Sequence, residues 1–189
     1  MDFLTALWLP ILLSAVFVFI ASTILHMLIP IHKGDYQKLP GEEKVLAEMR
    51  TQGVQPGEYM FPSACSMKEM ATPEMIEKYT KGPVGFMTVV PSGPWAMGKN
   101  LVQWFCYSIL VSIFTAYLAG HALSAGAEYL AVFRLTGTVA IVAYAFANIP
   151  NSIWRGTPWS ITLKFAFDGI IYGLVTAGAF GWLWPDTAA

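Results

Sequence analysis

Long uncharged runs of apolar residues dominate the sequence and predict four membrane-spanning helices. A helix needs roughly 20 apolar residues to cross a hydrocarbon core about 30 Å thick. Four segments reach this length, and they are residues 1–32, 100–123, 127–149 and 161–184. We number them spans one to four. The expected fold is an all-α, polytopic four-helix bundle in which residues 33–99 and 150–160 connect spans and residues 185–189 form a tail.

The first span is interpreted as a retained helix and not as a secretory signal. It has no positively charged segment at its start, its apolar stretch is too long, and no small-residue cleavage site follows it. Pro30 and Pro150 stand where spans one and three are expected to end, because proline disrupts a helix interior.

Basic residues predict the orientation of the chain. Between spans one and two lie eight of them, Lys33, Lys38, Lys44, Arg50, Lys68, Lys78, Lys81 and Lys99. Arg155 lies between spans three and four, whereas Asp2, the turn at residues 124–128 and the tail carry no Lys or Arg. The positive-inside rule therefore places residues 33–99 in the cytoplasm and both termini on the outer side of the membrane. For a bacterial inner membrane, the outer side is the periplasm.

Local signals predict short helices within residues 33–99. Acidic residues at the start and Gly53 at the end indicate a helix over Pro40–Gln52. Thr72 as N-cap followed by Pro73 indicates a second helix, which ends at Gly82-Pro83. The apolar stretch Val84–Val90 is too short to span, and we expect it to lie against the membrane or the bundle.

The composition excludes several classes of protein function. Hydrophobic residues make up 56% of the chain and charged residues only 12%, about half the charged share of a soluble domain. A net charge of -1 provides no basic field for nucleic acid. The sequence has no phosphate-binding glycine loop, no His-x-x-x-His helix and no nucleophile elbow. We therefore expect a protein that is not an enzyme, has no catalytic residue and uses no cofactor.

Ionisable residues inside the spans are the strongest candidates for function, because each costs at least about 2.5 kcal/mol in hydrocarbon without a partner. Span three carries Arg134, and span four carries Lys164 and Asp168. We predict an ion pair between Arg134 and Asp168, with Lys164 pairing with Asp168 or reaching toward the interface. Tyr172 and Asn148 extend the two polar faces. These faces either line a polar path or hold the helices together.

Small residues recur beside this polar face and predict close helix packing. On span four they are Gly169, Gly173, Ala177 and Gly181, and on span two Ser108 and Ser112. Such ridges let backbones approach closely, either within one chain or against a second copy.

Sulfur and imidazole groups give only weak metal candidates. Cys65, Met67 and Met70 are soft groups of the kind that select Cu(I), but methionine is also a common packing residue. His26 and His32 are six residues apart, so a continuous helix would place them on different faces. Hence no metal site is predicted, and His26 is expected to bond to a neighbouring helix while His32 meets headgroups.

Several short stretches resemble a family of small four-span bacterial inner-membrane proteins of no known activity. They are Leu39-Pro-Gly-Glu, Gly57-Glu-Tyr-Met-Phe-Pro62, Gly82-Pro-Val-Gly-Phe86, Ser152-Ile-Trp154 and the segment 164–173. The resemblance implies a four-span fold and a bacterial inner-membrane location. It implies no activity and assigns no role to any residue.

Three functions remain open at this point. The first is a small transport or pore-type homo-oligomer in which Arg134 and Asp168 line the path. The second is a non-catalytic accessory or structural subunit of a larger membrane complex. The third is a copper-binding membrane protein. The expected partners are the lipid bilayer and either further copies of the chain or a larger complex.

Overall fold

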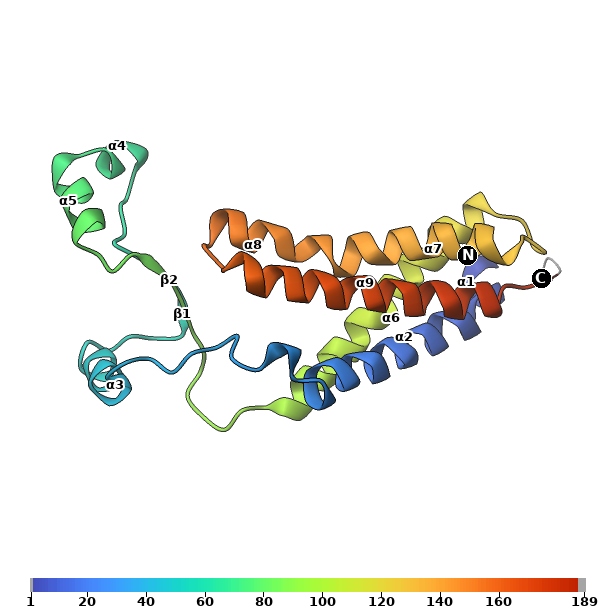
Figure 1. Ribbon diagram of the computed structural model, residues 1–189, viewed down its shortest axis with the longest axis horizontal. Helices are drawn as coiled ribbons and strands as arrows, with labels where there is room; N and C mark the ends of the chain where they lie inside the picture. The colour runs from blue at the N-terminus through green and yellow to red at the C-terminus, as the bar shows by residue number, and fades with distance from the viewer. Residues whose placement is uncertain (1, 187–189) are drawn as a thin grey trace. The chain divides into compact units, whose positions relative to one another are not determined.

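Four long helices form the bundle, as the sequence predicts (Figure 1). The computed structural model describes residues 2–186, so most of the predicted tail lies outside the described residues. Span one comprises α1 (Asp2–Ala6), α2 (Trp8–Thr23) and a π-helical turn, η1 (Ile24–Leu28). Span two is α6 (Met97–Ala122). Span three comprises α7 (Tyr129–Tyr144), the 3₁₀ turn η3 (Phe146–Asn148) and α8 (Ile149–Trp154), and span four is α9 (Trp159–Trp182). All four are long and apolar enough to cross a membrane.

The chain divides into two compact units. One, here called the bundle, comprises the residues up to Asp35, Ala96–Ser152 and the residues from Thr157 onward. The other, here called the connecting unit, comprises Tyr36–Trp95 and Ile153–Gly156.

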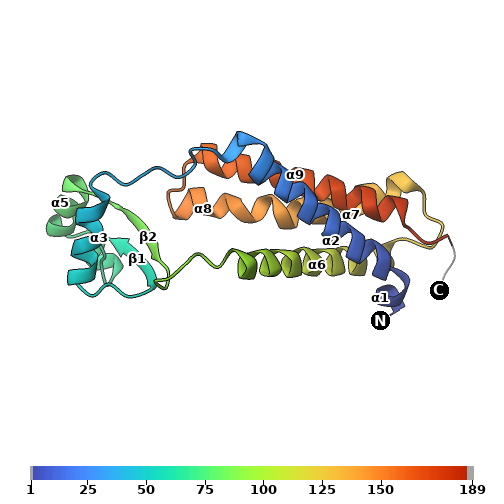
Figure 2. The ribbon, with the colours of Figure 1, turned by 90° about the horizontal axis from the view of Figure 1, so that it is seen from below.

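Helices α7 and α9 run side by side along their length, in contact through the small residues predicted to form a ridge (Figure 2). A Cβ added to Gly169 would lie 2.5 Å from the Cα of Ala145, and one added to Gly173 would collide with Ile141. One added to Gly181 would lie 2.6 Å from the Tyr129 ring. The ridge therefore packs against span three of the same chain. Its glycines allow the two helix backbones to approach closely, because a side chain at these positions would collide with span three.

Helices α2 and α6 are joined by buried hydroxyl groups. Ser14 and Ser112 are fully buried, and their Oγ atoms lie 2.9 Å apart. Ser108 is equally buried and donates to the carbonyl of Trp104. The two predicted packing serines of span two thus lie in the interior, where a hydroxyl group satisfied by a helix carbonyl or by a second hydroxyl allows close approach.

Span one is not the single straight helix expected over residues 1–32. It changes to a π-helical turn at Ile24–Leu28, becomes extended at Ile29 (φ -97°, ψ 124°) and continues as a 3₁₀ turn, η2 (Pro30–His32). Proline disfavours helical backbone in the residue before it, which explains the extended Ile29. The break redirects His32. His26 and His32 therefore do not lie on different faces of one helix, as the sequence predicted, and their rings are stacked.

The connecting unit contains both predicted helices. They are α3 (Glu42–Thr51) and α5 (Pro73–Lys81), and a further short helix, α4 (Met67–Met70), precedes α5. The Thr72 hydroxyl accepts a hydrogen bond from the Met75 N–H at 3.3 Å, as an N-cap does. Lys78 donates to Glu74 at 2.8 Å, and this hydrogen bond lowers the pKa of the Glu74 carboxyl.

Two strands of the connecting unit were not predicted. Strands β1 (Gly57–Phe61) and β2 (Gly85–Val89) form an antiparallel pair with Tyr59 opposite Met87. The apolar stretch Val84–Val90 is thus mostly a strand. Thr88 donates to Glu58 across the pair, and Arg155 donates to the other oxygen of Glu58.

Candidate functional site

Three side chains from the first and last spans meet inside the bundle. Asp168 on α9 is 1% exposed, and its Oδ2 lies 2.7 Å from Nε2 of His32 and 3.4 Å from Nε2 of His26. The two imidazole rings are stacked, with centroids 4.3 Å apart. Because η1 and η2 turn the chain back, both histidines direct Nε2 toward the same carboxylate.

A second carboxylate extends this cluster. Nδ1 of His32 lies 2.8 Å from Oδ2 of Asp35, and Lys164 of α9 donates a hydrogen bond to the other oxygen of Asp35. The Asp35 side chain is 2% exposed. Its hydrogen bonds from Lys164 and His32 hold the pKa of this carboxyl below its usual value. The contacts run in the order Lys164, Asp35, His32, Asp168, and we call these residues together with His26 the polar cluster.

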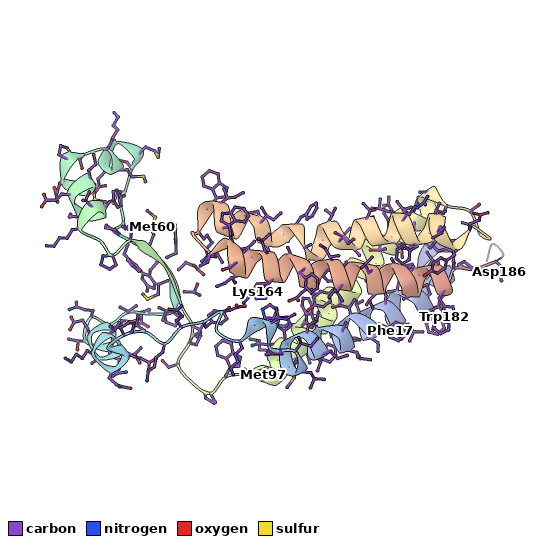
Figure 3. All side chains as sticks on the ribbon, in the orientation of Figure 1. Phe17, Met60, Met97, Lys164, Trp182 and Asp186 are labelled. Carbon is purple, nitrogen blue, oxygen red and sulfur yellow. The ribbon has the colours of Figure 1, made fainter. Side chains whose placement is uncertain are left out.

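A cavity of about 700 Å³ borders the polar cluster. His26 and Asp168 belong to its wall, together with Ser22 and Asn148. The rest of the wall is mainly aromatic and apolar, and every span contributes to it. Met97, labelled in Figure 3, is part of this wall. Lys164 lies near the start of α9, and Trp182 lies at the other end of this helix (Figure 3).

Four aromatic rings gather on one part of the cavity wall, and they are Trp104, Tyr107, Tyr144 and Tyr172. The Trp104 ring lies 5.7 Å from Tyr172 and 6.1 Å from Tyr144, measured between centroids. Trp104 donates its N–H to Ser22 of span one at 2.9 Å. The hydroxyl groups of Tyr144 and Tyr172 are buried without a hydrogen-bond partner among the described residues.

The predicted ion pair between Arg134 and Asp168 is wrong. Gly173 faces Ile141 and Gly169 faces Ala145, so Asp168 is level with the end of α7. Arg134 lies roughly twelve residues, or about 18 Å, away along α7. Its side chain is exposed on the outside of the bundle. The sequence estimate failed because it inferred depth from the ends of the spans and not from the helix register.

The other polar residues predicted in the spans have different outcomes. Lys164 pairs with Asp35 and not with Asp168. Tyr172 is buried at the cavity, one turn after Asp168. Asn148 also lies at the cavity and donates to the carbonyl of Tyr144 at 3.1 Å. The structure thus brings Asp168, Tyr172 and Asn148 together at one cavity and leaves Arg134 outside it.

The comparisons with known proteins do not extend this description. No protein family model, no curated protein and no solved structure matches the chain. The resemblance proposed from short sequence stretches stays an expectation.

The sulfur residues lie in a different part of the chain from the polar cluster. Cys65 is an exposed free cysteine of the connecting unit, and its N–H donates to Glu69. Met67 is 81% exposed. Among the described residues, the group of histidine, cysteine and acidic side chains close enough to hold a metal ion is His26, His32 and Asp168.

Sequence reasoning missed His32 and Asp35 as members of the site. One signal was present, because Pro30 stands between His26 and His32 and breaks the helix that would separate them. Asp35 carried no signal of its own, since an acidic residue after a span normally lies in water.

Proposed function

We propose that the chain binds a lipophilic molecule with a hydrogen-bonding head group inside the bundle, as a membrane protein of the transport type. The observation that supports this most directly is the cavity of about 700 Å³ with the buried Asp168 in its wall. Ligand sites for small molecules have this size, a mostly apolar lining and a few polar groups that orient the ligand.

Unpaired polar atoms near the cavity support a ligand with a polar head. Oδ1 of Asp168 and the hydroxyl groups of Tyr144 and Tyr172 are buried with no hydrogen-bond partner among residues 2–186. Leaving such groups unpaired costs about 1–3 kcal/mol each. A head group that both donates and accepts would satisfy them, and the aromatic rings would contact its apolar part.

The proposed path for the ligand differs from the one inferred from sequence. Asp168 belongs to a cavity within a single chain, whereas Arg134 is on the outside. The proposal therefore uses Asp168, Tyr172 and Asn148 and leaves Arg134 out. We further propose that the chain lies in a bacterial inner membrane with the connecting unit in the cytoplasm and both termini in the periplasm, because the basic residues favour this orientation.

The test fills the cavity and measures what co-purifies. Ala147 belongs to the cavity wall, and Ala131 is exposed on the same span away from it. The wild-type protein, Ala147→Trp and Ala131→Trp are extracted with mild detergent, and their bound small molecules are quantified per chain by solvent extraction and mass spectrometry. We expect one compound at about equal amounts in wild type and Ala131→Trp, and at least about tenfold less in Ala147→Trp.

Annular lipids co-purify with every variant and serve as an internal standard. A second pair, Leu101→Trp in the cavity wall and Leu110→Trp on the exposed face of the same helix, repeats the comparison if Ala147→Trp unfolds. Identical extracts from the cavity and control variants would contradict the proposal.

An accessory-subunit function is the second candidate, and the connecting unit favours it. Hydrophobic side chains of this unit are largely exposed, including Ile76 at 53%, Val84 at 58% and Trp95 at 71%. Where exposed apolar side chains form a contiguous patch, the patch is typical of an interaction site. Native mass spectrometry of the complex from native membranes separates the two functions. A multiple of 20.8 kDa supports a homo-oligomeric carrier, and additional polypeptides support an accessory subunit.

A further inference from the structure

We propose that His26, His32 and Asp168 bind a divalent metal ion of the Zn²⁺ class, with Asp35 as the residue that orients His32. Two imidazole nitrogens and one carboxylate oxygen form a ligand set that suits zinc and related transition ions. The site is separate from the Cys65 region in sequence and chemistry, and the inference does not depend on the lipophile.

The ligand atoms are close enough to share one ion, and two of their three separations can be compared with those of a zinc site. The candidate ligand atoms all lie within 4.8 Å of one another. Zinc binds nitrogen and carboxylate oxygen at about 2.0–2.2 Å, so two ligands of a tetrahedral site lie about 3.3 Å apart. Nε2 of His26 and Oδ2 of Asp168 are 3.4 Å apart and match this value. Nε2 of His32 is 2.7 Å from the same oxygen and must move by about half an ångström.

The hydrogen bond on the other side of His32 is the second observation. Its Nδ1 lies 2.8 Å from the Asp35 carboxylate, which can only accept a hydrogen bond. With its proton on Nδ1, a neutral imidazole directs the lone pair of Nε2 at Oδ2 of Asp168. Two electron-rich atoms at this separation require a cation between them, either a second proton or a metal ion. A carboxylate that fixes a histidine in this way is typical of metal ligands.

Asp168 provides a third observation, and a metal ion is an alternative to the lipophile head group as the partner of its Oδ1. Its side chain is 1% exposed, and Oδ1 has no hydrogen-bond partner among the described residues. A buried carboxylate normally satisfies both oxygens. Metal ligation neutralises the carboxylate, and Oδ1 becomes available to a metal-bound water or to the metal itself.

The site borders the cavity, because His26 and Asp168 belong to the cavity wall. A zinc ion with three protein ligands keeps one open position. Lys164 pairs with Asp35, and Asp35 in turn positions the proposed ligand His32 through Nδ1.

The experiment measures metal binding directly, with Zn²⁺ as the probe. Purified full-length protein carrying an affinity tag without histidine is stripped with a chelator and titrated with Zn²⁺ by calorimetry, and metal content is measured by elemental mass spectrometry. We expect one Zn²⁺ per chain in the wild type. His26→Gln is the key variant, because the His26 side chain is 37% exposed and Asp168 keeps its contact with His32.

We expect His26→Gln to weaken binding by more than about 100-fold and Asp35→Asn by about 10- to 100-fold at unchanged stoichiometry. The matched control is His121→Gln, because His121 is the remaining histidine of the chain and is exposed on α6. Co²⁺ substitution gives a second readout, since the visible spectrum of bound Co²⁺ reports its coordination by the protein. This spectrum should change in His26→Gln and stay unchanged in the control His121→Gln.

Two results would overturn the inference. One is an absence of stoichiometric Zn²⁺ binding by folded wild-type protein. The other is equal affinity in wild type and His26→Gln, which would leave the polar cluster as a hydrogen-bonded ion network without a metal. Unfolding of each variant is followed by its thermal transition, so that loss of binding is not confused with loss of structure.

Discussion

The Asp35 carboxylate is buried between Lys164 and His32, although it lies beyond the end of span one. Removing Lys164 leaves this negative charge with less compensation in the interior. We expect Lys164→Met to lower the midpoint of thermal unfolding, because the Asp35 carboxylate then loses the hydrogen bond from Lys164. The effect should be smaller than that of breaking a fully buried pair, because the Lys164 side chain is 33% exposed. Thermal unfolding of Lys164→Met, Asp35→Asn and the double variant measures the coupling between the two residues.

Arg134 is the matched control for this prediction, because it is also a cation within a span. It is exposed and has no ion-pair partner among the described residues, and its long side chain can extend toward the membrane interface. Arg134→Gln should change stability by less than about 0.5 kcal/mol. A loss as large as that of Lys164→Met would contradict the single-chain assignment of the pairs.

At the level of residues, the sequence identified the important charges of the last span but not their partners. Asp168 and Lys164 stand out because carboxylates and amines are rare in hydrocarbon. Their partners, His32 and Asp35, follow a helix break, and a short break changes direction in a way that apolar periodicity does not encode. Arg134 was wrongly predicted to pair with Asp168, because the sequence shows the residue type but not that its side chain is exposed.

Among the helices, the contact of α7 with α9 is the closest and the easiest to disturb. We expect Gly169→Ala to destabilise the protein by about 1–3 kcal/mol, since its Cβ would overlap the backbone at Ala145. Gly178 on the same helix has no atom within 4 Å of an added Cβ. There alanine should be neutral or stabilising by up to about 1 kcal/mol, through helix propensity. Unfolding curves of the two variants in detergent test the prediction, and equal effects would contradict it.

Helix α5 has a pH dependence of its own. Its hydrogen bond from Lys78 lowers the pKa of Glu74, so the carboxylate stabilises the helix at pH above the ordinary value of 4.5. This contribution is lost as the pH falls through the lowered pKa. Hydrogen exchange of residues 73–81 should therefore show more protection in wild type than in Glu74→Gln near neutral pH and a vanishing difference in acid. The difference is small, because both side chains are exposed.

Local chemistry predicted the two helices of the connecting unit but not the end of span three, because Pro150 lies inside α8 and the span continues to Trp154. The Thr72 cap and Pro73 gave α5 at its observed start, and the acidic first turn gave α3. Strands β1 and β2 were missed because their pairing joins segments separated by two helices. Short strands acquire their identity from such distant partners and not from local propensity.

The orientation of the chain in the membrane can be tested by labelling one natural and one introduced cysteine. Cys65 is exposed in the connecting unit, and Cys106 lies on α6 within the second span. We expect a membrane-impermeant maleimide to label Cys65 in inside-out vesicles and not in intact spheroplasts. Ser124→Cys in a Cys65→Ser background should give the opposite pattern, because Ser124 is exposed in the turn between α6 and α7. Labelling of both positions from the same side would contradict the predicted topology.

At the scale of the molecule, the number of spans follows from the sequence and the cavity does not. Each span is visible as a mostly apolar segment of sufficient length, although spans three and four carry charged residues. The cavity arises where side chains of all four spans leave a space, with Trp104, Tyr144 and Tyr172 in its wall. No single segment specifies that space, because it depends on the register between helices.

The contact between His32 and Asp168 also constrains how the protein is made. It joins residues 136 positions apart, and span one emerges from the ribosome well before span four. Without span one, a carboxylate such as that of Asp168 costs about 2.5–3.5 kcal/mol to place in lipid. Span four therefore enters the membrane most favourably when it docks on a first span already in place. The charge of Asp168 is therefore compensated by His32 once span four has met span one.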